Sequence, residues 1–242
     1  MSKISVVTVM FNPNLEQLEA TVNSVINQDF SDFEYILQDG GSDNKLLFDY
    51  LQGITEKYSF VKFFSKEDRS IYEGMNNAVK NSNGDYLLFV NVGDLIFSDS
   101  VLSDISRELS SEYAIIASRY VAYGEDIDGA SLLPQKKLNM LFITNLCHQT
   151  YFLKRDLIAF DTNYKLAADF KLLWDIFSVN HNDIKYVDYP VCFYLSGGVS
   201  DVGVRQVYWE TIKAILYNKQ IPLLLKLTNI IFYVLRLLRS CI

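Results

Sequence analysis

The stretch that decides the fold covers residues 66–94 and reads KEDRSIYEGMNNAVKNSNGDYLLFVNVGD. Its pattern predicts a loop, a helix over about residues 71–81, a turn and then a strand. The strand is the unbroken apolar run at residues 86–90, which suits a central strand covered on both faces. It breaks at once into the polar sequence NVGD at residues 91–94. Open α/β sheets bind ligands at such a point; the alternative is a turn that contains Asp94.

The residues before this stretch repeat the alternation of strand and helix. Apolar runs predict three further strands, at residues 4–9, 33–37 and 61–64. Helical spacing predicts two helices. The first has Asn12 as its N-cap and Pro13 at its first position, with apolar residues from Leu15 to Ile26 on one face, and the second covers residues 46–54. This alternation predicts a parallel sheet with right-handed crossover connections.

Three of the predicted strands end in polar side chains that suit a ligand: Thr8 and Asn12, then Asp39, then Asp94. Because parallel strands end at the same edge of a sheet, these residues predict a binding crevice there. The sequence has neither G-x-G-x-x-G after a strand nor a P-loop. Bound phosphates would therefore need a divalent cation held by carboxylate oxygen.

Charge is unevenly distributed along the 242 residues, whose net charge is −7. From residue 203 onward there are six basic residues and one acidic residue, so this tail carries +5 and the rest carries −12. The acidic body excludes general nucleic-acid binding, whereas the basic, apolar tail predicts contact with an anionic membrane face. The scattered cysteines and an N-terminus unlike a signal peptide predict a reducing, cytoplasmic location.

The motifs together resemble the family 2 glycosyltransferases, which have the GT-A fold and use nucleotide-sugar donors. The nearest resemblance is to bacterial enzymes that build surface polysaccharides. The matching pieces occur in family order, at residues 4–12 (ISVVTVMFN), 24–28 (SVINQ), 39–43 (DGGSD), 68–72 (DRSIY), 75–78 (MNNA), 84–85 (GD) and 91–94 (NVGD). Each piece alone is weak, but their combination is specific.

The resemblance implies a donor site along the predicted crevice. The residues that it places at the donor nucleotide are Thr8, Phe11, Asn12, Asp39, Asp68, Asn76, Asn91, Gly93 and Asp94. An aromatic ring such as that of Phe11 stacks on a base, and a carboxylate such as that of Asp39 accepts the uracil N3–H. For Asp68 the alternative is a carboxylate that stabilises the start of a helix.

The resemblance also implies a divalent metal, Mn²⁺ or Mg²⁺, at Asp94, which matches the last acid of the family's D-x-D signature. Val92 stands where the first acid of that signature is usual, and no histidine follows His181 to complete a metal site. One protein carboxylate, the donor diphosphate and water would then surround the ion, an environment that Mg²⁺ accepts.

Asp169 matches the family's catalytic base, the last acid of a pair that opens a helix, with Ala168 in place of the usual Glu. The alternative is an Asp that stabilises its own helix. His148 and Gln149 resemble the segment that enters the acceptor side, and imply acceptor or auxiliary contacts. A packed, hydrogen-bonded histidine is the alternative for His148, and the favoured interpretation of His181.

The second half of the chain carries weaker signals. They predict a helix at residues 101–109, one or two strands at 113–122, a loop over the site at 124–135, a strand at 184–195 in which Pro190 marks a bulge or an edge strand, and a loop at 196–200. We expect a GT-A catalytic domain at residues 1–202, with a donor half at 1–98 and an acceptor half at 99–202. A helical segment follows at residues 203–242.

The last twenty residues predict an amphipathic helix. Polar residues recur at spacings of 3 and 4 as Lys226, Asn229, Tyr233, Arg236 and Ser240. The longest charge-free stretch is nine residues, whereas a membrane span needs about 20. We therefore expect residues 221–242 to lie in the membrane interface; docking on the body or on a second subunit, as in a homodimer, is the alternative.

The resemblance and the residues predict an inverting glycosyltransferase, of the hexosyl or N-acetylhexosaminyl type. It would move a sugar from a UDP-sugar to a glycan or lipid-linked acceptor in bacterial surface polysaccharide synthesis, at the inner face of the cytoplasmic membrane. Two other functions stay open. One is a scaffold that binds nucleotide-sugars without catalysis, and the other is a sugar nucleotidyltransferase, whose Gly-rich basic loop this chain lacks.

Overall fold

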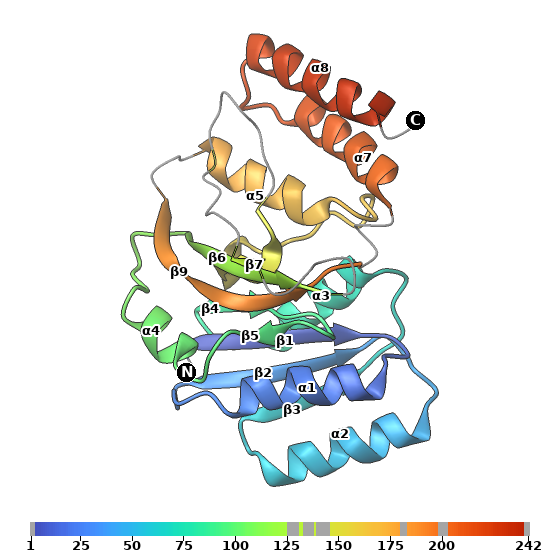
Figure 1. Ribbon diagram of the computed structural model, residues 1–242, viewed down its shortest axis with the longest axis vertical. Helices are drawn as coiled ribbons and strands as arrows, with labels where there is room; N and C mark the ends of the chain where they lie inside the picture. The colour runs from blue at the N-terminus through green and yellow to red at the C-terminus, as the bar shows by residue number, and fades with distance from the viewer. Residues whose placement is uncertain are drawn as a thin grey trace.

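The first half of the chain folds as the predicted alternation of strands and helices (Figure 1). The computed structural model describes residues 3–124, 131–132, 138, 146–179, 183–197 and 203–239. The elements of this half are β1 (Ile4–Met10), α1 (Leu15–Ile26), β2 (Phe33–Asp39), α2 (Lys45–Lys57), β3 (Val61–Ser65), α3 (Ile71–Asn81) and β4 (Tyr86–Phe89). The predicted loop at residues 124–135 and His181 lie mostly or wholly outside the described residues.

The start of α1 differs from the prediction, because Asn14 rather than Asn12 caps the helix. The Asn14 side chain accepts a hydrogen bond from the backbone N–H of Gln17 at 3.0 Å. Asn12 has a φ of 43°, a left-handed conformation that an extended N-cap residue does not adopt. Its backbone N–H donates to Ser42 Oγ at 2.7 Å, which joins the loops that follow β1 and β2.

The second half adds shorter strands and more helices. Its elements are β5 (Leu95–Ile96), α4 (Val101–Ser106), β6 (Ile115–Tyr123), β7 (Ser131–Leu132), β8 (Tyr151–Lys154), α5 (Ala168–Val179), β9 (Ile184–Leu195), α7 (Val204–Tyr217) and α8 (Leu223–Arg239), with 3-10 turns at His148–Thr150 and Arg155–Leu157. Helix α4 is shorter than predicted. The pairing of β6 with β9 is irregular where Arg119 meets Pro190, as the proline predicted.

The strands form one mixed sheet in the order β3-β2-β1-β4-β8-β6-β9-β5, with β7 paired to β6. Strands β3, β2, β1 and β4 are parallel, whereas β8 is antiparallel to both β4 and β6. The chain moves outward from β1 through β2 to β3, and then returns to the other side of β1 for β4. This reversal puts a crevice at the carboxyl ends of β1 and β4, where α/β sheets bind ligands.

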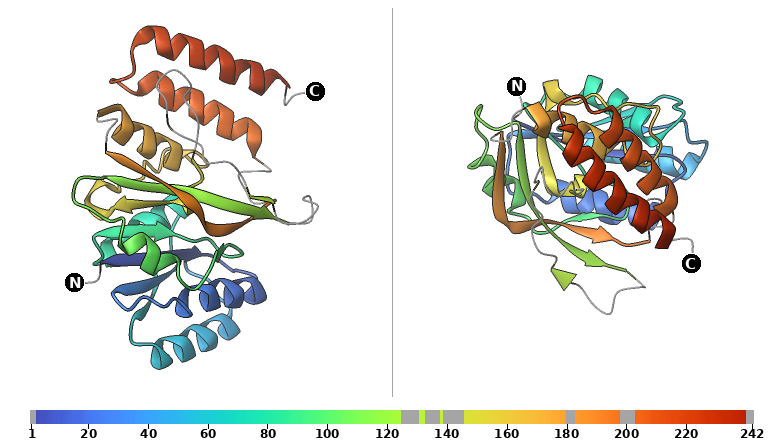
Figure 2. Two further views of the ribbon diagram at one scale, coloured as in Figure 1. Left: turned by 60° about the vertical axis from the view of Figure 1, so that its left-hand side comes forward. Right: turned by 90° about the horizontal axis from the view of Figure 1, so that it is seen from above.

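Two hydrophobic clusters cover the faces of the sheet. One joins α1 and α2 to the sheet through Leu18, Leu47 and Leu51, and the other joins α3 and α5 to it through Met75 and Phe170. Helices α7 and α8 extend the second cluster beyond α5, at the end of the molecule opposite α2 (Figures 1 and 2). Among the described residues, no helix has the length and apolar character that crossing a bilayer requires.

Candidate active site

A cavity of about 1610 Å³ lies at the crevice that the strand order creates. Its wall includes Val9 near the end of β1, Asn91 and Asp94 after β4, Tyr72 on α3 and Asp169 on α5. Pockets for a single ligand measure roughly 300–1,000 Å³. This cavity therefore has room for two substrates side by side.

Asp94 occupies the wall on the β4 side, and only 3% of its surface is exposed. Its Oδ1 accepts a hydrogen bond from the backbone N–H of Leu195 at 2.8 Å, and its Oδ2 accepts one from Gln149 Nε2 at 2.7 Å. Gly93 has a φ of +96°, and its N–H donates to Thr21 Oγ1 at 2.9 Å. A side chain on Gly93 would lie 2.7 Å from Leu195, so this glycine shapes the turn that carries Asp94.

Burial raises the pKa of Asp94 from 3.8 to about 6, although the hydrogen bonds from Leu195 and Gln149 act in the opposite direction. The folded state therefore binds this proton more tightly than the unfolded state does. The resulting stability is fully present below about pH 4 and is lost as the pH rises through about 6. At neutral pH the buried carboxylate is thus destabilising unless a cation offsets its charge.

Asp94→Asn removes this titration, and its effect on stability should depend on pH. From about pH 7 to about pH 5, the metal-free wild type should gain about 1 kcal/mol in unfolding free energy relative to the variant. Urea denaturation of both proteins at the two pH values measures this difference. An equal response of the two proteins to pH would show that Asp94 titrates normally.

Asp169 faces the same cavity from the first turn of α5 and is 6% exposed. Its Oδ1 accepts hydrogen bonds from the Tyr72 hydroxyl at 3.0 Å and from the backbone N–H of Phe170 at 2.8 Å. Burial and the Asp169 charge raise the pKa of Tyr72 well above its ordinary value, so the tyrosine remains a donor. Tyr72 was missed in the sequence, although it ends the DRSIY motif.

His148 joins the two sides of the cavity. Its Nδ1 lies 3.3 Å from Asp169 Oδ2, and its Nε2 lies 3.0 Å from Asn91 Nδ2. A neutral imidazole that donates from Nδ1 to the carboxylate accepts from the amide at Nε2, which fixes its tautomer. The next residue, Gln149, donates to Asp94. The two acids are therefore linked through adjacent residues of one 3-10 turn.

Glu210 of α7 holds the turn that leads into α5. Its Oε1 accepts from the backbone N–H of Lys165 at 3.0 Å, and its Oε2 accepts from those of Leu166 at 2.8 Å and Ala167 at 3.0 Å. Asp169 follows this turn directly, so Glu210 positions it from a distant part of the sequence. Sequence analysis did not identify this role of Glu210. The one feature that could have drawn attention to it is that Glu210 is the single acidic residue after residue 202.

Glu210→Gln should lower the unfolding free energy by about 1–3 kcal/mol, because the new amide NH₂ faces backbone donors in a buried position. Chemical denaturation measures the change. The matched control is Glu19→Gln, an exposed glutamate on α1, for which we expect a change within about 0.5 kcal/mol. Equal effects of the two substitutions would contradict the role assigned to Glu210.

Two residues predicted at the nucleotide are fully buried. Thr8 is 0% exposed, and its hydroxyl donates to the carbonyl of Val90 at 2.8 Å. Asp39 is also 0% exposed, and its carboxylate accepts hydrogen bonds from Gly41, Ser42 and Ser65. Both side chains are therefore fully buried and hydrogen-bonded within the fold, and their contacts with the nucleotide stay predictions.

Of the other residues predicted at the donor nucleotide, Phe11 and Asn12 are exposed, whereas Asn76 and Asp68 pack against other parts of the protein. Phe11, 65% exposed, and Asn12 stand at the surface after β1, where a base can reach them. The Asn76 amide borders the cavity but is paired with the backbone of Phe160, at 2.8 and 2.9 Å. The Asp68 carboxylate packs against Gly40 and Gly74, where a Cβ would lie 2.7 Å from its Oδ2, and burial raises its pKa.

Basic residues not singled out in the sequence gather around the cavity. Lys66, Arg69, Lys80 and Lys165 line it, together with the acids Glu73, Asp94 and Asp169. The net charge of the wall is thus positive, in a protein whose overall charge is −7. Such a wall attracts an anionic ligand.

The residues that border the cavity fit a metal held by a single carboxylate. Within the described ranges, no group of three or more His, Cys, Asp or Glu residues forms a metal cluster. Asp94 nevertheless keeps lone pairs beyond those used by Leu195 and Gln149, and its raised pKa marks a charge that a cation would offset. A magnesium-like ion would take its remaining ligands from phosphate and water.

The sequence matches the model of glycosyl transferase family 2 over residues 5–177. The chain belongs to this family. A cholesterol galactosyltransferase from Borreliella burgdorferi is 28% identical over 134 residues, covering 54% of this chain and 37% of that protein. A PGL/p-HBAD biosynthesis glycosyltransferase from Mycobacterium bovis is 26% identical over 205 residues, covering 79% of this chain and 77% of the relative.

Solved structures confirm the predicted GT-A fold. S. aureus TarS 1–349 in complex with UDP superposes with a TM-score of 0.67 at 22% identity, over 90% of this chain and 66% of that one. The mannosyltransferase PcManGT from Pyrobaculum calidifontis, in complex with GDP-Man and Mn²⁺, gives a TM-score of 0.65 at 12% identity, over 88% of this chain and 63% of that one. At these identities the likeness concerns the fold alone.

Proposed function

We propose that this family 2 glycosyltransferase is an inverting hexosyl- or N-acetylhexosaminyltransferase that uses a UDP-sugar. The acceptor is a hydroxyl of a glycan or of a lipid-linked acceptor in bacterial surface polysaccharide synthesis, and residues 1–202 form the catalytic domain. The observation that carries this proposal is the pair of buried carboxylates, Asp94 and Asp169, which line one cavity and are joined through His148 and Gln149.

Asp169 acts as the base in this scheme. Its carboxylate takes the proton of the acceptor hydroxyl, whose oxygen forms a bond to the anomeric carbon as the bond from that carbon to the diphosphate breaks. The proton ends on Asp169, and UDP leaves with the bonding electrons. Attack opposite the leaving group inverts the anomeric carbon. Tyr72 and His148 hold the carboxylate in place by hydrogen bonds at 3.0 and 3.3 Å.

Asp94 and the basic residues face the leaving group. A divalent metal ion, Mn²⁺ or Mg²⁺, bound at Asp94 would neutralise the charge that develops on the diphosphate. Lys66 and Arg69 line the same cavity and offer further positive charge. Val92 leaves Asp94 as the one acid of the D-x-D position, so the nucleotide diphosphate itself supplies part of the metal site in this scheme.

UDP is favoured over GDP by the solved TarS complexes, which contain UDP and UDP-GlcNAc, whereas PcManGT contains GDP-Man. Phe11 supports base binding because its exposed ring is free to stack. A sugar nucleotidyltransferase is disfavoured, since the loop after β1 reads Phe11-Asn12-Pro13-Asn14 without a basic, Gly-rich segment.

The proposal is tested by calorimetric titration of UDP and GDP, each with and without Mn²⁺, followed by release of UDP from a panel of UDP-sugars. We expect UDP to bind, Mn²⁺ to strengthen its binding, and one UDP-sugar to be consumed. Tight binding of GDP instead would overturn the donor assignment. Nucleotide binding without any turnover would favour a scaffold, and no nucleotide binding would overturn the proposal as a whole.

A further inference from the structure

Helix α8 turns most of its apolar residues away from the body of the protein, although Leu225 and Ile230 pack against the core. Eight of the apolar residues are exposed by 38–72% of their surface: Leu223, Leu224, Leu227, Ile231, Phe232, Val234, Leu235 and Leu238. Its buried residues are the polar Asn229 and the tyrosine Tyr233, at 4% and 6% exposed. This arrangement is the reverse of a helix that covers a core, in which the apolar stripe points inward.

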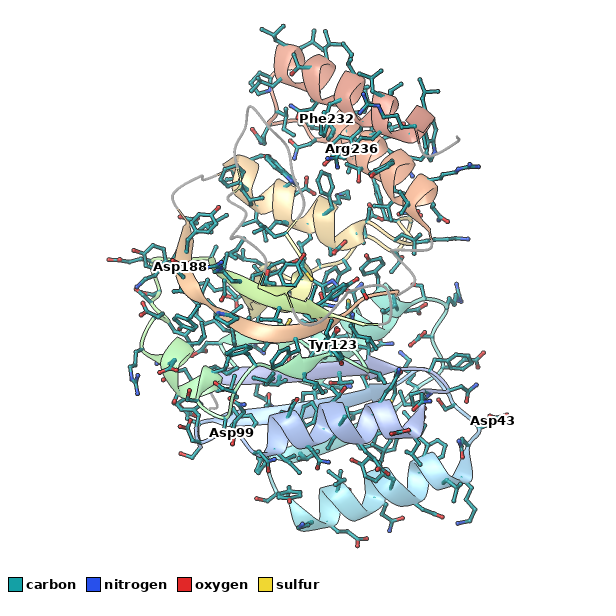
Figure 3. All side chains as sticks on the ribbon, viewed as in Figure 1. Asp43, Asp99, Tyr123, Asp188, Phe232 and Arg236 are labelled. Carbon is teal, nitrogen blue, oxygen red and sulfur yellow. The ribbon has the colours of Figure 1, made fainter. Side chains whose placement is uncertain are left out.

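The exposed residues form a continuous stripe. At about 100° per residue, all except Phe232 fall within an arc of about 120°, whose centre lies opposite Asn229. Lys226 and Arg239 flank the stripe on its two sides, and Arg236 lies over the Phe232 ring at 4.6 Å (Figure 3). An apolar stripe with basic flanks is the pattern of a helix that lies in a membrane interface.

The buried side of α8 contacts the helix that carries Asp169, the proposed catalytic base. The Tyr233 ring lies 6.5 Å from the Phe170 ring, edge to face. Phe170 follows Asp169 and donates its backbone N–H to that carboxylate at 2.8 Å. Helices α8, α7 and α5 lie together at one end of the molecule (Figures 1 and 2), and the Tyr233–Phe170 contact joins α8 to the helix that carries Asp169.

We propose that the outer stripe of α8 docks on an anionic lipid bilayer and so holds the candidate active site close to a lipid-linked acceptor. The charge distribution favours an anionic bilayer as the partner of this stripe, because residues 203–242 carry a net charge of +5 while the rest of the chain carries −12. An anionic surface attracts the α8 end and repels the body, which fixes the orientation. A second copy on the same stripe would instead bring like charges together. The acceptor part rests on the proposed function, whereas the docking does not.

Vesicle co-sedimentation of the full chain tests the docking. The vesicles are phosphatidylcholine alone, or phosphatidylcholine with about one third phosphatidylglycerol. We expect at least about tenfold tighter binding to the anionic vesicles at low salt, and weaker binding as salt is raised. The triple variant Leu227→Gln, Ile231→Gln, Leu235→Gln should lose at least about tenfold in vesicle affinity, because its three side chains enter the bilayer.

A matched control carries three similar substitutions elsewhere, Leu46→Gln, Leu157→Gln and Val179→Gln, at residues that are also exposed. It should bind vesicles as the wild type does, and circular dichroism should show both variants folded. No vesicle binding by the wild type, or equal loss in both variants, would overturn the proposal. So would a dimer in light scattering that the α8 variant alone disrupts without any vesicle binding. UDP binding and turnover in solution are measured separately from vesicle binding. Loss of UDP binding would therefore count against the proposed function, whereas loss of vesicle binding would count against the docking.

Discussion

Asp169→Asn should lower kcat by about 10²–10⁴-fold while UDP affinity stays within about twofold of the wild type. The amide has nearly the same shape and still accepts from the Tyr72 hydroxyl, but it cannot take the acceptor proton. In the proposed scheme the nucleotide binds beside Asp94, on the other side of the cavity, so its binding should be spared. Release of UDP during sugar transfer measures kcat, and calorimetry measures UDP affinity.

Asp156→Asn is the control for this substitution, since Asp156 is exposed and lies in the 3-10 turn after β8. It should keep the wild-type kcat. Retention of activity in Asp169→Asn would remove this residue as the base. A parallel loss of UDP affinity and of kcat would instead indicate that the substitution distorts the whole cavity, which thermal denaturation would detect.

The main elements of the first half follow from local signals in the sequence. An unbroken apolar run predicted β4, and mostly apolar segments predicted β1 and β2, because both faces of these central strands are covered. The first residue of α1 could not be predicted from local signals, since Asn12 and Asn14 are equally good N-cap residues. A tertiary hydrogen bond from Asn12 to Ser42 decides between them. The length of α4 was overestimated for a similar reason, because helical propensity near residue 107 gives no stop signal.

The candidate site was predictable where a polar residue follows a strand or opens a helix, as Asp94 and Asp169 do. The full burial of Thr8 and Asp39 could not be predicted in this way. Strand-end residues alternate between faces, and their burial depends on neighbours that the local sequence does not reveal. Glu210 was missed because its partners lie 43–45 residues away, where no local spacing rule reaches.

Asp94→Asn should abolish the strengthening of UDP binding by Mn²⁺, which we expect to be about 10-fold or more in the wild type. Loss of an outer partner of a metal ligand typically costs about 10–100-fold in metal affinity, and loss of the sole protein carboxylate should cost at least as much. Without Mn²⁺ the variant should bind UDP as well as the wild type or better, because a negative charge near the diphosphate has been removed.

Asp99→Asn provides the matched comparison, as Asp99 is an exposed acid a few residues further along the chain, on the outer surface near α4 (Figure 3). Uridine, which lacks the diphosphate, should bind both variants and the wild type equally, with or without Mn²⁺. If Asp94→Asn retained the full effect of Mn²⁺ on UDP, the ion would have to be held by other groups. If Mn²⁺ had no effect on the wild type, the basic residues Lys66 and Arg69 would be the agents that neutralise the diphosphate, and Asp94 would serve to order Gln149 and Leu195.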